Sequence, residues 1–128
     1  MEASYHLGDL QLAIMRVLWG HGEATVADVH ETLEPERGLA LTTIATMLAK
    51  MEKKGVVDHR AEGRRFIYRP LVSESQVRHS MVAGLTSQLF RGDVTALVNH
   101  LLSEHDIDAQ ELTQLRELIS AHEHKEDR

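Results

Sequence analysis

Apolar side chains recur at helical spacing through the first part of the chain, and a short alternating stretch then interrupts them. Between residues 9 and 19 they return every three or four positions, and glycines at positions 20 and 22 end this predicted helix. A second short helix is predicted after Thr25, a suitable N-cap, and residues 35–38 are predicted to form the turn that follows it. A third helix is predicted over residues 41–54, with Gly55 just past its C-terminus.

The alternating stretch directly after the third helix predicts a β-hairpin. Its strands are expected over residues 56–61 and 65–71, and Glu62-Gly63 is expected to form the tight turn between them. Three helices followed by a hairpin, in this order, predict a winged helix-turn-helix.

The rest of the chain is predicted to be helical. Ser73 should cap one helix, Gly92-Asp93 should break it, and Asp108 should cap the last helix. The polar tail, residues 122–128, is expected to fray.

The predicted fold class is mainly α with a small β-hairpin. A winged helix-turn-helix DNA-binding domain is expected over residues 1–71, followed by a three-helix C-terminal dimerisation region over residues 72–128. Three short helices are too few to bury their own apolar faces, which must pack on the winged domain or on the same helices of a second chain. The second arrangement relates two reading helices by a two-fold axis and suits a palindromic operator. The leucines expected to build the dimer and its local core are Leu85, Leu89, Leu97, Leu101, Leu112, Leu115 and Leu118.

Composition narrows the class of protein. The 128 residues suffice for one domain with an appended element, and 42% hydrophobic with only 4% aromatic content favours a core of packed helices. The absence of cysteine excludes disulfides and thiolate metal sites. Neither a leader-like segment nor a bilayer-long apolar run is visible, so a cytoplasmic protein without a membrane partner is expected.

Charge is distributed unevenly along the chain. The net charge of −6 argues against a nucleic-acid partner, but residues 50–69 hold seven Lys and Arg against three Asp and Glu. Residues 72–128 hold five basic and ten acidic side chains. Because salt screens charges beyond about 8 Å, the local balance decides whether a phosphate is attracted. The sequence therefore predicts a cationic reading end and an anionic far end.

The third predicted helix carries the candidate base-reading residues. Thr43, Thr46 and Lys50 are spaced i, i+3, i+7 and so share a face. Threonine offers a hydroxyl and a methyl group to base edges, and lysine reaches guanine acceptors or phosphates. The alternative is an ordinary solvated face, but β-branched threonines suit a plain exposed helix poorly. With a basic hairpin behind the helix, we favour DNA reading in the major groove.

Four further residues are expected to position the phosphate backbone. They are Thr42, Lys53, Arg64 and Arg65. The two arginines lie at the tip of the predicted hairpin, which in winged domains follows the backbone or enters the minor groove. For these arginines alone, a charged hairpin that merely resists edge aggregation is an equally good interpretation.

Other functions find weaker support in the sequence. Among nine histidines, His100, Glu104 and His105 lie close together, but no ligand set with zinc spacing is visible, so neither a metal nor a cofactor is expected. A metal-gated or pH-gated repressor that uses these residues remains a minority hypothesis. No phosphate-binding loop or nucleophile elbow is present, so we expect no catalysis and no catalytic residue. A winged-helix adaptor that binds proteins is the main rival.

Several segments together resemble the BlaI/MecI family of penicillinase-repressor regulators. They are LGDLQLAIMRVLW, TVADVHETL, LTTIATMLAKMEKKGVV, EGRRFIYRPLVSE and LFRGDVTALVNHLLSE. The resemblance implies a homodimeric repressor that binds an operator dyad upstream of resistance or stress genes. By position, Thr42, Thr43, Thr46 and Lys50 match the DNA-reading helix of the family, and Gly63-Arg64 matches its wing.

The chain differs from the family at positions that carry regulatory features in some of its members. Family members relieved by proteolysis share an Asn-Phe bond in the helix after the Gly-Asp break, where this chain has His100-Leu101. A sensor protease is therefore left open as a partner. Copper-responsive relatives carry C-terminal cysteine pairs, which this chain lacks. Near the start of the first helix, Asp9 is followed by Gln11-Leu12 where the family often has an acidic residue.

Overall fold

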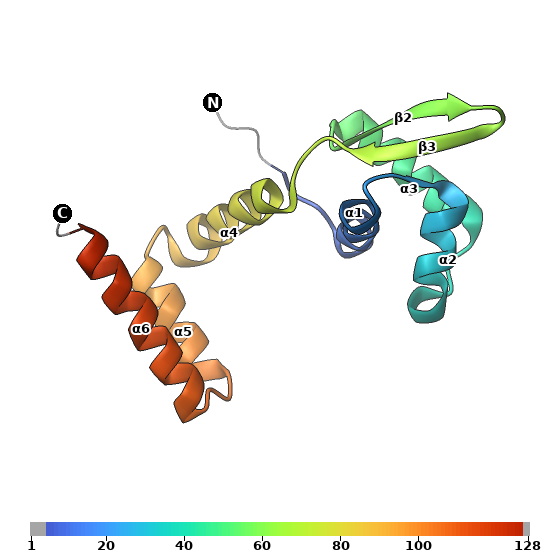
Figure 1. Ribbon diagram of the computed structural model, residues 1–128. Coiled ribbons are helices and arrows are strands. Elements are labelled where there is room, and N and C mark those ends of the chain that lie inside the picture. The colour runs from blue at the N-terminus through green and yellow to red at the C-terminus, as the bar shows by residue number, and fades with distance from the viewer. Residues whose placement is uncertain (1–4, 127–128) are drawn as a thin grey trace. The chain divides into compact units, whose positions relative to one another are not determined.

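The computed structural model describes residues 5–126, which form a mainly helical chain with a small antiparallel sheet (Figure 1). This confirms the predicted fold class. The elements, in order, are α1 (Asp9–His21), β1 (Ala24–Thr25), α2 (Val26–Arg37), α3 (Leu41–Lys54), β2 (Val57–Glu62), β3 (Arg65–Pro70), α4 (Glu74–Phe90), α5 (Val94–Glu104) and α6 (Ala109–Glu126). The chain divides into two compact units between Gly84 and Leu85, inside α4.

The first unit is a winged helix-turn-helix. Helices α1, α2 and α3 pack around an aliphatic core in which Ile14, Leu18, Val29 and Leu48 are fully buried. Each such side chain contributes about 1.5–3 kcal/mol by leaving water. The sheet order is β1-β3-β2, and β2 and β3 form the wing.

The wing differs from the prediction by one residue. Glu62 pairs with Arg65, so the two-residue turn is Gly63-Arg64 rather than Glu62-Gly63. Gly63 has φ +64°, a left-handed conformation that glycine adopts without steric cost. Strand β1 was not predicted, because two residues carry no periodic pattern.

Helix α2 runs through the residues that were predicted to form a turn. Pro35 lies inside the helix, so the prediction of a turn over 35–38 was wrong. Proline has no N–H to donate to the carbonyl four residues earlier, but only two helical residues follow it before the helix ends. Gly38, at φ +56°, ends the helix and donates its N–H to the carbonyl of Glu34 at 2.9 Å.

The predicted starts of the last helices are confirmed by their caps. Ser73 Oγ accepts from the N–H of Gln76 at 3.0 Å before α4, and Asp93 and Asp108 accept equivalent bonds before α5 and α6. Helix α6 continues to Glu126, so the prediction that residues 122–126 fray was wrong. This stretch contains no proline or glycine, and the positive charge of Lys125 favours a helix C-terminus. Residues 127–128 lie outside the described part.

The apolar side chains of α5 and α6 stay largely in contact with water. No residue of either helix is buried, and Leu118 and Ile119 are more than half exposed. None of the helices between residues 5 and 126 is long and apolar enough to cross a membrane.

Candidate nucleic-acid interface

Helix α3 presents a polar face opposite the face that anchors it. Ile44, Leu48 and Met51 are buried in the core, and their helical spacing places the other side of α3 in solvent. The structure brings the predicted residues of this helix together on that exposed side. They are Thr42, Thr43, Thr46, Lys50 and Lys53, and we call them the α3 polar face.

The threonine hydroxyls of the α3 polar face are not engaged within the protein. Two other helical threonines, Thr32 and Thr113, each donate to the carbonyl four residues earlier, at 2.9 Å. Within residues 5–126, Thr42, Thr43 and Thr46 make no side-chain hydrogen bond. Their hydroxyls are therefore free to bond a ligand.

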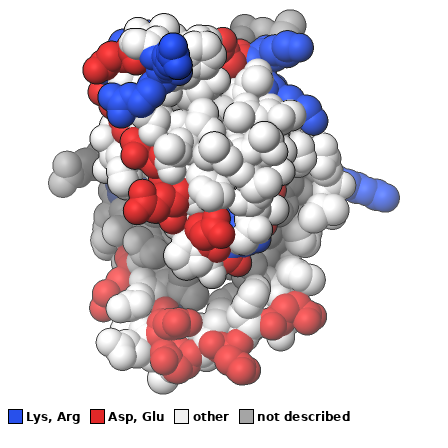
Figure 2. Space-filling view, turned by 90° about the vertical axis from the view of Figure 1, so that its right-hand side faces the viewer, with Lys and Arg blue, Asp and Glu red and all other residues white. Residues whose placement is uncertain are grey.

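The predicted wing arginines lie exposed at the tip of the hairpin. Arg65 lies 3.9 Å from Glu62, a distant surface pair, and Arg64 has no ion-pair partner in the described part of the chain. Seen from the side of this tip, Lys and Arg side chains gather at the hairpin end, beside Asp and Glu (Figure 2).

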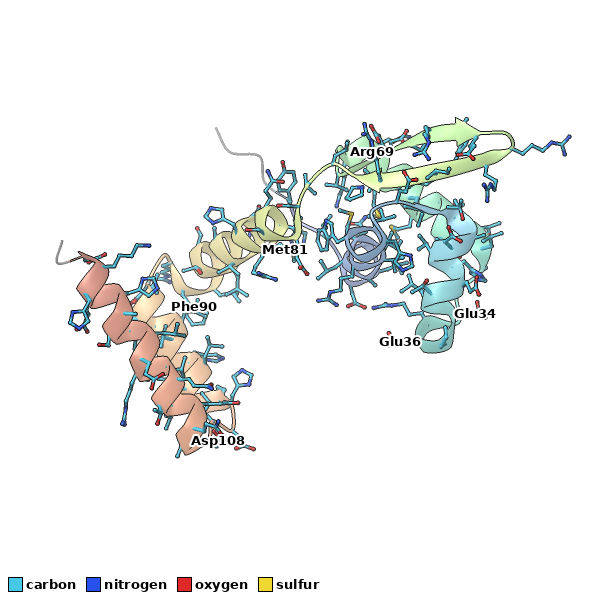
Figure 3. The ribbon with its side chains drawn as sticks, viewed as in Figure 1. Glu34, Glu36, Arg69, Met81, Phe90 and Asp108 are labelled. Atoms are coloured by element: carbon cyan, nitrogen blue, oxygen red, sulfur yellow. The ribbon has the colours of Figure 1, made fainter. Side chains whose placement is uncertain are left out.

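Three other basic residues of this stretch form ion pairs or hydrogen bonds within the protein. Arg60 forms a two-pronged pair with Glu23 at 2.6 and 3.0 Å. Arg69, on β3, pairs in the same way with Asp58 at 2.6 and 3.1 Å (Figure 3). Lys54 bonds the carbonyl of His6 at 2.8 Å and the side chain of Gln11. The cationic stretch therefore leaves Lys50, Lys53, Arg64 and Arg65 as its available charges.

The two arginine–carboxylate pairs shift the pKa values of both partners. The hydrogen bond and charge of Arg69 hold the pKa of Asp58 below its ordinary value, and Arg60 does the same to Glu23. In return, each carboxylate raises the pKa of its arginine. The four side chains thus stay charged and paired over the whole neutral range.

A hollow that the sequence did not reveal lies between α2, α3 and the wing. It encloses about 390 Å³, and its lining residues are Thr25, Val26, Ala27, Asp28, Leu41, Arg64, Arg65 and Phe66. Thr25 and Asp28 form a capping box in it, and hydrogen bonds from Thr25 lower the pKa of Asp28, with the charge of Arg65 adding to the effect. The T-V-A-D cap was visible in the sequence, but its position beside the wing depends on the fold.

His100, Glu104 and His105 are the residues of the metal-gated or pH-gated hypothesis. Within residues 5–126 no group of three or more potential ligands converges. His100 instead lies edge-on against the ring of Phe90, with centroids 5.7 Å apart.

The predicted dimer leucines lie in α4, α5 and α6. Leu85, Leu89, Leu101, Leu112, Leu115 and Leu118 are exposed, and Leu97 is half-buried. Val94, Val98, Leu102 and Ile119 are further exposed apolar residues of α5 and α6.

Known proteins resemble this chain along most of its length. A family model described as Penicillinase repressor matches residues 7–121. A penicillinase repressor of Bacillus licheniformis is 26% identical over 125 residues, which cover 98% of this chain and 98% of that protein. The transcriptional regulator BlaI of Mycobacterium tuberculosis is 41% identical over 80 residues, covering 62% of this chain and 55% of that protein.

Two solved structures resemble more than half of this chain. The solution structure of the DNA-binding domain of the repressor BlaI has a TM-score of 0.52 at 34% identity, covering 59% of this chain and 93% of that one. The Bacillus licheniformis BlaI monomeric form in complex with the blaP half-operator has a TM-score of 0.51, with the same identity and coverage. The resemblance found in the sequence is confirmed, and the chain belongs to the penicillinase repressor family.

Proposed function

We propose that this chain, a DNA-binding transcriptional repressor of the penicillinase repressor family, acts as a homodimer on a palindromic operator. One observation carries the proposal above the others. The α3 polar face keeps three hydroxyls and two ammonium groups free of intramolecular partners in the described chain, directly opposite a fully buried anchor. A family resemblance alone would not require that arrangement.

The chemistry of this face fits the major groove. An α-helix fits the groove, threonine can bond base edges and touch the thymine methyl group, and lysine can bond guanine acceptors. We assign Thr43, Thr46 and Lys50 to the base edges. We assign Thr42, Lys53, Arg64 and Arg65 to the phosphate backbone, because they flank the reading residues or lie on the wing. The similarity of this chain to BlaI in complex with the blaP half-operator supports operator binding.

The C-terminal helices supply the reason for a dimer. Helices α5 and α6 bury no residue in the single chain, although both carry rows of Leu, Val and Ile. Helices of this kind gain stability when a second copy covers their apolar faces. A two-fold axis through that contact would give two reading helices for one operator dyad. A transcriptional repressor must reach chromosomal DNA, which in bacteria lies in the cytoplasm. We therefore place this protein in the cytoplasm.

The experiment measures mass and DNA binding on the same preparation. Light scattering after gel filtration should give twice the mass of the chain. Fluorescence anisotropy with a random-sequence duplex should show binding that weakens steeply with salt, with a log–log slope of about −0.9 per phosphate neutralised. A monomer that ignores duplex DNA at low salt would instead favour the protein adaptor. Binding that responds to zinc, copper or mild acid would revive the gated variant.

A further inference from the structure

The side chain of His59 connects the reading helix to the wing. Its Nδ1 lies 2.5 Å from Oε1 of Glu52, near the C-terminus of α3. Its ring stacks on Phe66 of β3, with centroids 4.2 Å apart and planes inclined by 27°. The ring of Tyr68, also on β3, is tilted against it with centroids 5.3 Å apart. One residue of β2 thus contacts the reading helix and the opposite strand of the hairpin together.

The outer half of the wing has little other support. Strand β1 pairs only with Ile67 and Tyr68, so the pairs Ala61–Phe66 and Glu62–Arg65 belong to a two-stranded ribbon. A hairpin of two strands is marginally stable in water on its own. Its direction relative to α3 therefore depends on side-chain contacts at its base.

Other polar contacts of the hairpin do not reach α3. The pair of Arg69 and Asp58 joins β3 to β2, and the pair of Arg60 and Glu23 joins the hairpin to the residue before β1. In the described part of the chain, the bond between His59 and Glu52 is the side-chain hydrogen bond that joins the hairpin to the reading helix. It is also shielded, since the two side chains are only 28% and 35% exposed.

We infer that His59 is a positioning residue for DNA binding, which fixes the wing relative to α3 so that both meet the same duplex. This inference rests on the proposed function. The ligand concerned is the DNA backbone at the wing. When His59 holds the hairpin, Arg64 reaches a phosphate while the α3 polar face lies in the groove. Without that bond the wing swings on its base, and the arginine loses its fixed target.

The test counts phosphate contacts in three variants of the full chain. Affinity for a random-sequence duplex is measured between about 50 and 200 mM salt, where each lost phosphate contact makes the log–log slope less negative by about 0.9. His59→Ala should show the slope of Arg64→Ala and the same fold-loss of affinity. The double variant His59→Ala/Arg64→Ala should bind no more weakly than Arg64→Ala alone, because both changes remove one contact.

Glu52→Ala is a second variant, for which charge and wing position predict opposite changes in DNA affinity. Removing a carboxylate beside DNA should strengthen binding if charge alone mattered, whereas loss of wing position should weaken it. Glu34→Ala is the matched control, because Glu34 pairs with His30 inside α2 at 2.8 Å and does not reach the wing. Circular dichroism of each variant checks that the fold is intact.

The possible results distinguish a failure of the role of His59 from a failure of the proposed DNA-binding function. A wild-type chain that binds no duplex overturns the proposed function itself. A wild-type chain that binds with the expected salt slope, together with His59→Ala and Glu52→Ala variants that match it, overturns only the role of His59. Additive losses in the double variant would also overturn that role.

Discussion

The indole Nε1 of Trp19 donates a hydrogen bond of 2.8 Å to the carbonyl oxygen of Val72. This bond joins the end of α1 to the residue that precedes the cap of α4, although 53 positions separate them in the sequence. Trp19 packs beside the core, and Val72 is buried within it. The point at which the winged unit passes into α4 is therefore held by a specific side chain.

Replacing Trp19 with Phe should destabilise the winged unit. The change keeps an aromatic ring but removes the donor, so the carbonyl of Val72 loses its partner, at a cost of about 1–3 kcal/mol. Urea unfolding followed by circular dichroism measures the free energy of unfolding. An unchanged value would mean that water replaces the indole without loss.

Replacing Thr46 or Lys50 with Ala should reduce specificity for the operator. Each change should cost about 1–3 kcal/mol on a selected duplex and much less on random DNA, because a base-edge contact is lost. Thr32→Ala is the matched control, since the hydroxyl of Thr32 is already bonded to Asp28 within α2. Equal preference for selected over random DNA in the variants and the wild type would remove base reading from the α3 polar face.

Charges on the apolar side of α6 should dissociate the dimer. Leu115→Asp and Leu118→Asp place a carboxylate on a surface that we expect a second copy to cover, and burying an unpaired charge there costs several kcal/mol. Sedimentation velocity should show a shift toward monomer, with an unchanged circular dichroism spectrum. Ser120→Asp adds the same charge on the polar side of α6 and should leave the assembly intact. Dimers in all three variants would locate the contact elsewhere.

The pair of Arg69 and Asp58 should add a small stability that disappears in acid. Because the pKa of Asp58 is lowered in the folded chain, its contribution is present above the ordinary value of 3.8 and is lost as the pH falls through the folded value. The melting temperature of the wild type should therefore exceed that of Arg69→Ala at neutral pH, and the two should converge once the pH falls below the lowered pKa of Asp58. Arg116→Ala, on α6, should show no such dependence. A difference that persists in strong acid would point to packing rather than charge.

Local patterns in the sequence were sufficient for most of the fold. Periodicity identified the helices, and caps such as Ser73 and Asp108 marked where they begin. The anchor of α3 and its opposite polar face followed from spacing alone. The errors lay where the pattern is short or ambiguous, as in the two-residue strand β1 and in α2, which runs past Pro35.

The candidate site was less accessible to sequence reasoning. The basic stretch appeared as one cationic surface, yet Arg60 is neutralised by Glu23, which lies 37 positions away. Nothing local in the sequence indicates that partnership. The contacts of His59 with Glu52 and Phe66 likewise depend on the pairing of the hairpin over α3.

Selection of binding sites from randomised duplexes with the full chain tests the central claim most directly. If two α3 polar faces grip one double helix, the recovered sequences should form an inverted repeat, with half-sites centred one helical turn, about 10 base pairs, or a multiple of it apart. The chain with both Thr46→Ala and Lys50→Ala should recover a weaker repeat or none. No enrichment, or enrichment of a single site without a dyad, would contradict the account.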